Sequence, residues 1–268
     1  MKRYDVIIVG AGVAGMTAAI YAKRAGKSVL VLESKIYGGQ IVQTYKVTNW
    51  PGEKEISGVD LSKKIFDQIK ELGVVLEYAE VLEIKTSEEF ISVGDAENDT
   101  RKLWEIKTDD GEYVCGVLIV AVGTEPRKLS KAQAEDVGER AISYCATCDG
   151  ALYKDKPVVV VGSGNTAKHE MQYLSNIASK VYHIHHDDPI PKDAVAVFVA
   201  IGRVPKTEFL DGVVNLDKDG YIVAGEDCKT SCPGIFVAGD CRTKAVRQLV
   251  TAAADGAVAA TEAVHYLG

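Results

Sequence analysis

Two cysteines that stand two residues apart, Cys145 and Cys148, are the residues of this chain best suited to redox chemistry. They frame a Cys-Ala-Thr-Cys tetrad, which Asp149 and Gly150 follow at once. Thiols at this spacing can close a disulfide, and a neighbouring carboxyl can carry the proton that thiol–disulfide exchange transfers. The motif therefore predicts a redox-active pair with Asp149 as its proton carrier.

A structural pair or half of a zinc site would use the same two cysteines. A tetrahedral zinc site needs four ligands, however, and no second Cys-x-x-Cys or His-x-x-x-His motif follows in the sequence. A Cys-x-x-Cys pair near a strand–helix–strand pattern favours the redox interpretation, and we expect no metal site. The remaining cysteines are predicted to be small buried hydrophobic residues, because their spacing lacks the tight clustering of iron–sulfur ligands. They are Cys115, Cys228, Cys232 and Cys241.

A dinucleotide-binding pattern opens the chain. An apolar strand over residues 4–9 leads into Gly-Ala-Gly-Val-Ala-Gly at 10–15, a helix over 16–24 and a second strand over 28–32 that ends at Glu33. The glycines let the backbone approach a pyrophosphate, the start of the helix offers free N–H groups, and Glu33 can accept hydrogen bonds from a ribose. Strand, loop, helix, strand and terminal acid together predict a dinucleotide site.

The pattern occurs a second time in the middle of the chain. A strand over 157–161 is followed by Gly-Ser-Gly-Asn-Thr-Ala at 162–167, a helix that extends to about residue 175 and a strand over 180–185. Taken alone, this repeat would predict a pyridine nucleotide site.

Composition and charge narrow the range of functions. The chain has 268 residues, 47% of them hydrophobic and 25 of them glycine, which fits an α/β protein of one large or two modest domains. A net charge of −7 argues against a nucleic-acid partner. Met1 leads directly into the first strand and no apolar stretch reaches the roughly 18 residues of a membrane span, so we expect a cytoplasmic protein without a membrane partner.

Four further stretches resemble the low-molecular-weight thioredoxin reductases. Gly-Gly-Gln at 38–40 and Thr-Asn-Trp-Pro-Gly at 48–52 are similar to the segment that runs beneath the flavin ring in that family. Gly-Ile-Phe-Val-Ala-Gly-Asp at 234–240 and Arg-Gln-Leu-Val at 247–250 resemble its second FAD motif. The resemblance implies that the first dinucleotide is FAD.

The resemblance also implies an α/β fold with two Rossmann-like nucleotide-binding domains. A complete FAD domain would comprise residues 1–112 and 201–268, and a shortened second domain over 113–200, inserted in the first, would carry the cysteine pair. Hinges are expected near residues 114–116 and 202–203. The residues implied to bind FAD are Gly10, Gly12, Ala14, Gly15, Glu33, Gly39, Gln40, Asn49, Val81, Gly123, Gly239, Asp240, Arg247, Gln248 and Leu249.

The second domain departs from the NADPH-dependent members of the family. These members follow its second strand with a His-Arg-Arg run that binds the 2′-phosphate, whereas this chain has His185, His186, Asp187 and Asp188. Too few residues then precede the next strand, at 195–200, for another strand–helix–strand unit. The pattern is similar to the ferredoxin-dependent flavin thioredoxin reductases, so ferredoxin is the expected electron donor. NADH, with Asp187 or Asp188 on its ribose, and NADPH remain alternatives.

By the same resemblance Cys148 lies next to the flavin, Cys145 attacks the substrate disulfide, Asp149 is the general acid–base, and thioredoxin is the substrate of a homodimeric enzyme. A flavin dithiol oxidase that uses oxygen and a non-catalytic FAD-binding scaffold remain alternatives. An acidic ferredoxin would need a local basic surface. The candidates for it are Lys35, Arg127, Lys128, Arg203, Lys206, Arg242 and Lys244.

Overall fold

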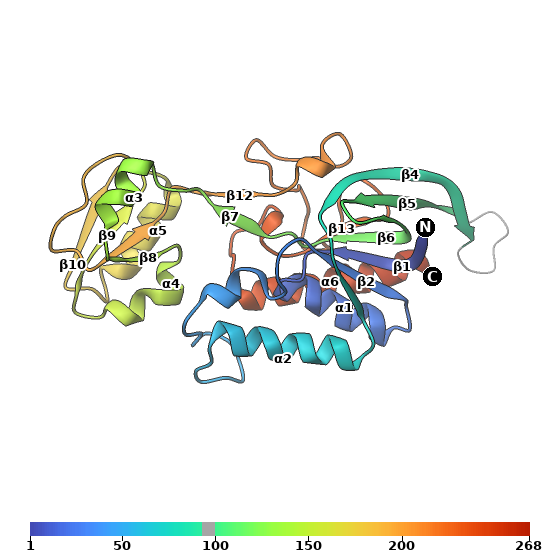
Figure 1. The fold of residues 1–268 in the computed structure, drawn as a ribbon, viewed down its shortest axis with the longest axis horizontal. Coiled ribbons are helices and arrows are strands. Elements are labelled where there is room, and N and C mark those ends of the chain that lie inside the picture. Colours follow the sequence, from blue (N-terminus) through green and yellow to red (C-terminus); the bar gives the residue numbers. More distant parts are fainter. Residues whose placement is uncertain (93–99) are drawn as a thin grey trace. The chain divides into compact units, whose positions relative to one another are not determined.

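A computed structural model describes residues 1–92 and 100–268 of the chain (Figure 1). The described residues fall into two compact units. The first unit comprises residues 1–45, 50–124 and 205–268, and the second comprises residues 46–49 and 125–204. The second unit is therefore an insertion within the first, to which residues 46–49 add a short segment.

The first unit is built on one sheet. Seven strands of the described chain form it: β1 (Lys2–Val9), β2 (Val29–Glu33), β3 (Val75–Tyr78), β4 (Val81–Ser92), β5 (Thr100–Thr108), β6 (Glu112–Val120) and β13 (Ile235–Val237). Their order is β3-β2-β1-β6-β5-β4, and β13 also pairs with β6. β1, β2, β3, β6 and β13 are parallel to one another, whereas β5 runs antiparallel to both of its neighbours, β6 and β4. The second half of β1, from Val6 to Val9, and β2 up to Leu32 are apolar and buried because a parallel sheet is covered on both faces.

Three helices of the described chain accompany this sheet, and the first of them is the helix predicted after the first glycine-rich loop. They are α1 (Val13–Arg24), α2 (Gly58–Glu71) and α6 (Leu249–Leu267), with short 3₁₀ turns η1 (Gly39–Gln43), η3 (Glu208–Leu210) and η4 (Gly239–Cys241). α6 lies directly against α1. The two backbones are so close that a Cβ atom at Gly256 would stand 2.2 Å from the carbonyl oxygen of Ala14. This close approach requires the small side chains on the facing sides of both helices.

The second unit repeats the strand–helix order on a smaller scale. Its strands are β8 (Ala141–Ser143), β9 (Pro157–Val161), β10 (Lys180–Ile184) and β11 (Ala196–Val199), and its helices are α3 (Lys131–Val137), α4 (Ala146–Asp149), the 3₁₀ turn η2 (Gly150–Tyr153) and α5 (Asn165–Leu174). The strands are all parallel, in the order β10-β9-β11-β8. Both units therefore have the Rossmann-like α/β order that the sequence predicts.

Two short strands carry the chain between the units. β7 (Thr124–Pro126) and β12 (Arg203–Pro205) pair with each other, and the unit boundaries fall within them. One expected hinge, at 202–203, lies at this ribbon. The other, at 114–116, is wrong, because these residues lie inside β6 and are hydrogen-bonded between β1 and β5. The whole of β6 belongs to the first unit, so the first boundary lies after residue 124 rather than at 112.

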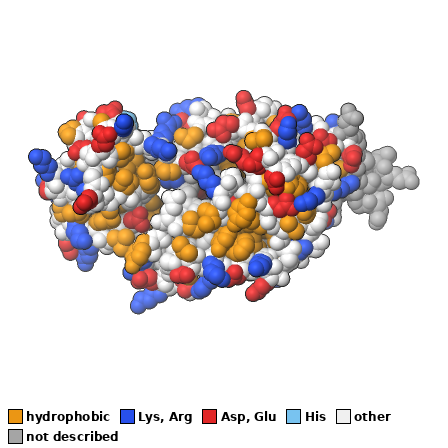
Figure 2. Space-filling model, viewed as in Figure 1, with side chains coloured by type: hydrophobic (Ala, Val, Ile, Leu, Met, Phe, Trp, Pro, Cys, Tyr) orange, Lys and Arg blue, Asp and Glu red, His pale blue; other side chains and the backbone are white. Residues whose placement is uncertain are grey.

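The surface is of mixed charge. Figure 2 shows basic and acidic side chains interspersed over the visible face, without a broad field of one sign. None of the helices in the described parts of the chain is long and apolar enough to cross a membrane.

Candidate functional site

The first glycine-rich loop joins β1 to α1 with unusually close backbone contacts. Gly10 has φ +104°, and a Cβ atom there would stand 2.4 Å from the carbonyl oxygen of Ala121, which follows β6. A Cβ atom at Gly15 would stand 1.9 Å from the carbonyl oxygen of Gly10. The first and third glycines of the motif are therefore required by the protein itself.

Gly12 has a different role. It precedes α1 with φ −72°, so its backbone does not require glycine, and a Cβ atom there would meet no protein atom within 4 Å. No side chain caps this end of α1. The start of the helix thus faces open space, with uncapped backbone N–H groups, as a pyrophosphate site requires.

Glu33 closes the other side of this loop. It is the last residue of β2, and its carboxylate accepts hydrogen bonds from the N–H groups of Ala11 and Lys35, both at 2.8 Å. The carbonyl oxygen of Glu33 accepts from the N–H of Ala79, which places the segment leading to Val81 beside it. The predicted ribose-binding acid therefore lies at the loop, as expected.

The other predicted FAD residues of the first unit converge on the same loop. Gly39 and Gln40 form the start of η1, and a Cβ atom at Gly39 would lie 3.5 Å from the Cα of Gly12. Gln40 donates a hydrogen bond of 2.6 Å to the carbonyl oxygen of Thr124, directly after Gly123. Asn49 belongs to the segment grouped with the second unit.

The C-terminal motif meets the loop through Gly239. This residue has φ +82°, and a Cβ atom there would lie 2.9 Å from the Cβ of Ala14 in the first turn of α1. Only glycine therefore lets η4, which contains Asp240, approach the loop this closely. Two motifs that are more than 220 residues apart thus form one site.

A buried carboxylate that the sequence analysis did not single out holds η4 in place. Asp255, in α6, accepts hydrogen bonds from the backbone N–H of Gly239 (3.0 Å), from Nε (3.0 Å) and Nη2 (2.9 Å) of Arg242 and from Nζ of Lys244 (2.7 Å). Burial acts to raise the pKa of Asp255, but the hydrogen bonds from Arg242 and Lys244 outweigh it and lower the pKa. An acid among the small and apolar residues of the first three turns of α6 was the signal that could have identified it.

This network corrects the predicted basic surface. The side chains of Arg242 and Lys244 are only 2% and 5% exposed, because they bind Asp255. They cannot form part of a docking surface. Arg247 donates to the carbonyl oxygens of Asp240 and Arg242, both at 3.2 Å, so its guanidinium supports η4. Gln248 then precedes α6, whose first residue is Leu249.

The redox turn lies in the second unit. Cys145 and Cys148 form a disulfide with a Cα–Cα distance of 5.3 Å, and α4 begins between them. Asp149 accepts a hydrogen bond of 2.6 Å from the hydroxyl of Ser143, which is buried, and the same Ser143 oxygen accepts from the N–H of Cys145 (3.2 Å). Ser143, which the sequence analysis did not single out, thus links the predicted proton carrier to the cysteine pair.

Glu170 is a further acidic residue at this turn. It projects from α5, and its Oε1 lies 3.5 Å from the N–H of Ala146, the first residue of α4. Burial raises the pKa of Glu170 to about 7, and repulsion by Asp149 acts in the same direction. Its spacing in the sequence gives no signal of this position.

The second glycine-rich loop has the backbone of the first. Gly162 has φ +145°, and a Cβ atom there would stand 2.3 Å from the carbonyl oxygen of Ala200, just as Gly10 faces Ala121. Gly164 precedes α5 with φ −84° and has no side-chain cap, and a Cβ atom there would meet no protein atom within 4 Å. The repeat predicted from sequence is therefore present in three dimensions.

The second unit has no acid at the position that corresponds to Glu33 of the first unit. β2 is aligned with β1 so that Glu33 follows the final pair, Val9 and Leu32. β10 is aligned with β9 in the same way, and the residue that follows their final pair is His185. A histidine therefore stands where the first unit has Glu33, the predicted ribose-binding acid.

The two acids beyond His185 are engaged in the turn before β11. Asp188 accepts a hydrogen bond of 2.8 Å from the N–H of His185. Hydrogen bonds from Ser130 and His186 lower the pKa of the exposed Asp187 carboxyl, and Asp187 itself has φ +77°. These contacts weaken the alternative in which either carboxylate accepts from a nucleotide ribose.

The same turn is anchored by α3 and the residues after it. Gln133 donates to the carbonyl oxygens of His185 (3.2 Å) and Asp188 (3.1 Å), and Arg140 donates to that of Ala194 (2.9 Å). The short connection between β10 and β11 is therefore a well-formed part of the unit.

The four cysteines outside the redox turn are free thiols that are buried or partly buried. Cys115, Cys228 and Cys241 are buried, and burial raises the pKa of each thiol, to about 12 for Cys228 and Cys241. Cys232 is partly buried. Within residues 1–92 and 100–268, no three His, Cys, Asp or Glu side chains gather in a way that could hold a metal ion.

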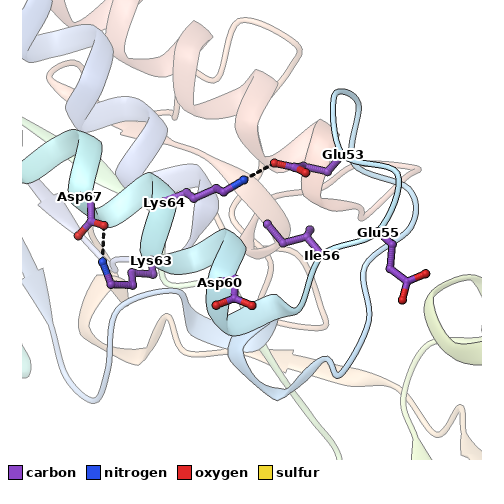
Figure 3. Close-up of a pocket in the computed structure, with 7 residues that line it drawn as sticks. All are labelled: Glu53, Glu55, Ile56, Asp60, Lys63, Lys64 and Asp67. Atoms are coloured by element: carbon purple, nitrogen blue, oxygen red, sulfur yellow. Dashed lines mark hydrogen bonds and ion pairs between the residues drawn. The ribbon is translucent and has the colours of Figure 1, made fainter.

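A pocket beside α2 contains none of the predicted site residues (Figure 3). Two ion pairs neutralise much of its charge: Lys63 with Asp67, and Lys64 with Glu53. Its lining consists of Glu53, Glu55, Ile56, Asp60, Lys63, Lys64 and Asp67. It offers neither a glycine-rich loop nor a thiol and is not a candidate for the chemistry above.

Comparison with known proteins agrees with this site. The family model for pyridine nucleotide-disulphide oxidoreductases matches residues 4–193 and 187–256. A thioredoxin reductase of Listeria innocua is 35% identical over 314 aligned residues, which cover 99% of this chain and 94% of that protein. A "34.2 kDa protein in rubredoxin operon" of Clostridium pasteurianum is 36% identical over 315 residues, covering 100% and 98%.

Solved structures of thioredoxin reductases are also similar to this chain. The thioredoxin reductase of Streptococcus pyogenes superposes with a TM-score of 0.86 at 30% identity, covering 99% of this chain and 98% of that one. A ferredoxin-flavin thioredoxin reductase of Clostridium acetobutylicum superposes with a TM-score of 0.60 at 30% identity, covering 99% and 98%.

The chain belongs to the pyridine nucleotide-disulphide oxidoreductase family. It is a flavoprotein, and its cofactor is FAD. The loop around Gly12, the carboxylate of Glu33 and the closely packed η4 fit this cofactor, since a Cβ atom at Gly12 would occupy the space in front of α1.

The comparisons also indicate where this chain is shorter than its relatives. The match to the Listeria protein runs over 314 positions and this chain has 268 residues, so at least 46 of those positions carry no residue of this chain. The two segments matched by the family model meet at residues 187–193, in the turn before β11.

Replacing Gly12 by Val should weaken FAD binding by more than about tenfold, or 1.4 kcal/mol, because the side chain would fill the pyrophosphate space. The fold should persist, since the side chain would meet no protein atom near its Cβ. Gly164→Val is the matched control in the second loop and should retain full FAD. The measurement is FAD content and affinity by absorbance and fluorescence; equal FAD content in the two variants would contradict the assignment.

Replacing Asp255 by Asn should destabilise the first unit by about 3–5 kcal/mol, because two buried cations lose their counter-charge. Since the folded-state pKa of Asp255 lies below its ordinary value of 3.8, its stabilisation is present above that value and is lost as the pH falls through the folded-state pKa. The difference between wild type and variant should therefore shrink in acid. Denaturant unfolding measures it, and exposed Asp211→Asn, the control, should change stability by less than about 0.5 kcal/mol.

Proposed function

We propose that this enzyme is a FAD-dependent thioredoxin reductase that takes its electrons from reduced ferredoxin rather than from a pyridine nucleotide. The observation that carries the reductase assignment is the Cys145–Cys148 disulfide with Asp149 on the same turn, in a chain with a complete FAD loop. We also propose that it works in the cytoplasm as a homodimer, as the resemblance implies.

When bound, FAD can accept single electrons and deliver a pair, which joins a one-electron donor to a two-electron disulfide. The protein then supplies the thiol chemistry. The Cys145 thiolate attacks a disulfide sulfur of thioredoxin, forming a mixed disulfide and releasing one thioredoxin thiolate. Cys148 attacks Cys145 in turn, which restores the Cys145–Cys148 disulfide and releases the second thiolate. Thioredoxin gains two electrons and two protons, and the cysteine pair loses them.

Asp149 is suited to the proton transfers in this sequence. It lies one residue after Cys148, and Ser143 holds its carboxylate by a hydrogen bond of 2.6 Å while accepting from the N–H of Cys145. Thiolate leaving groups depart faster when they are protonated on departure, so a carboxyl held at this position can act as the general acid.

Two features of the second unit support a donor other than NADPH. His185 stands at the register position of the ribose-binding acid, and the following acids would repel a 2′-phosphate where arginines are needed. The missing alignment positions and the short, anchored turn between β10 and β11 leave little chain with which to complete a nicotinamide site. The similarity to a ferredoxin-flavin thioredoxin reductase is in agreement with this proposal.

Reduced ferredoxin would bind through a local basic surface. Because Arg242 and Lys244 are buried, the remaining candidates are Lys35 and Lys206 in the first unit and Arg127, Lys128 and Arg203 in the second. Such a surface would make electron transfer faster at low ionic strength.

The Cys148→Ser variant should trap thioredoxin on Cys145, because the resolving thiol is missing. A suitable substrate is a thioredoxin variant with one active-site cysteine, activated as its thionitrobenzoate disulfide. Release of the thionitrobenzoate anion and mass spectrometry of the adduct are the measurements. Cys145→Ser, the matched control, should give no adduct; a bond to any other cysteine would contradict the assigned roles.

NADPH and NADH should not bleach the flavin anaerobically at catalytic speed, whereas reduced ferredoxin should. Loss of two charge-assisted phosphate contacts costs about 1.5–3 kcal/mol for each hydrogen bond, before repulsion is counted. Stopped-flow absorbance measures the rate, and dithionite serves as the control that the flavin is reducible. Rapid bleaching by a pyridine nucleotide would return the enzyme to the nicotinamide-dependent class, and peroxide release during dithiol turnover would favour a dithiol oxidase.

A further inference from the structure

The carboxyl of Glu170 lies against the redox turn without belonging to the thiol chemistry described above. α5, which carries it, packs closely on the turn, since a Cβ atom at Gly150 would stand 3.1 Å from the side chain of Leu174 and 3.2 Å from that of Tyr173. Ala146, between the two cysteines, is 1% exposed and belongs to the same core cluster as Leu174. Glu170 is therefore held in a fixed relation to the cysteine pair.

Three groups face the Glu170 carboxyl. The N–H of Ala146 lies 3.5 Å from Oε1, at the long end of the hydrogen-bond range, and Arg203 and Asp149 act on the carboxyl through their charges. The second oxygen, Oε2, is buried and has no hydrogen-bond partner. An ionised carboxylate in this position is poorly solvated and poorly paired.

We propose that Glu170 is an electrostatic positioning residue of the redox turn, whose ionised carboxyl opposes formation of the Cys145 thiolate. The argument rests on the proposed function only in taking Cys145 as the attacking thiol. Ala146, whose N–H lies 3.5 Å from Oε1 of Glu170, is bonded directly to Cys145, so the carboxyl lies one residue's backbone away from the attacking cysteine. Like charges at such a distance disfavour each other's ionisation.

The charge of Glu170 changes near neutral pH. Burial raises the pKa of Glu170 to about 7, with repulsion by Asp149 in the same direction and Ala146 and Arg203 opposing it. Below this pH the Glu170 carboxyl is neutral, and above it the carboxyl carries a negative charge. This charge affects the ionisation of Cys145, in which the thiol loses a proton to water without any change of oxidation state.

The test is the pH profile of Cys145 alkylation in the FAD-containing enzyme, reduced with dithiothreitol and desalted. Iodoacetamide reacts with the thiolate, and tandem mass spectrometry assigns the modified cysteine. Glu170→Gln should lower the apparent pKa of the Cys145 thiol by about one unit. At pH 5.5 the two enzymes should react at equal rates, because Glu170 is then protonated and glutamine resembles it in shape and charge.

Two further variants make the result decisive. Glu135→Gln removes an exposed carboxylate from α3 of the same unit and should leave the wild-type profile unchanged. Glu170→Met, which is also neutral, should reproduce the profile of Glu170→Gln and replaces it if that variant does not fold. Superimposable profiles would overturn the proposal, as would an equal rate difference at every pH, which indicates a change of shape rather than of charge. The assay uses neither thioredoxin nor an electron donor, so a failure to reduce thioredoxin would contradict the proposed function alone.

Discussion

The flavin unit depends on how closely backbone segments approach one another around the first turn of α1. Gly10, Gly15, Gly239 and Gly256 each occupy a position where a Cβ atom would lie within 3 Å of a neighbouring atom. These contacts bring the β1 loop, η4 and α6 together, and the buried carboxylate of Asp255 holds η4 and the segment that follows it by four hydrogen bonds, one from the N–H of Gly239 and three from Arg242 and Lys244. The open space in front of Gly12 exists because the surrounding glycines allow this packing.

The second unit has a glycine-rich loop with the same backbone, next to the redox turn. Its glycine-rich turn places α5 against the cysteine pair, so that Leu174 and Glu170 support the turn that contains Ala146. Its strand register puts His185 where the first unit has Glu33. The glycine-rich loop of the second unit thus also helps to position a thiol pair, and α4 and α5 place the acidic residues Asp149 and Glu170 beside that pair.

The sequence predicted the features that depend on local patterns. Both strand–loop–helix repeats, the cysteine pair with Asp149 and the acid Glu33 were found where the spacing predicted them, because these features follow from backbone geometry within short segments. Long-range packing was less accessible. A hinge was expected at Cys115, which lies inside a strand of the central sheet, and Arg242 was expected on the surface, where it instead pairs with Asp255. Glu170 reaches the redox turn only through tertiary structure, whereas Ser143 lies two residues before Cys145 and depends on the local turn for its hydrogen bond to Asp149.

The central claim is that the flavin and the Cys145–Cys148 pair form one path for electrons, and a reductive titration tests it most directly. Anaerobic addition of dithionite, followed by flavin absorbance, counts the electrons that each chain accepts. The wild-type enzyme should accept two for FAD and two for the disulfide, whereas Cys148→Ser should accept only the two for FAD. If wild type and variant accept the same number, the disulfide does not exchange electrons with the flavin and the account is wrong.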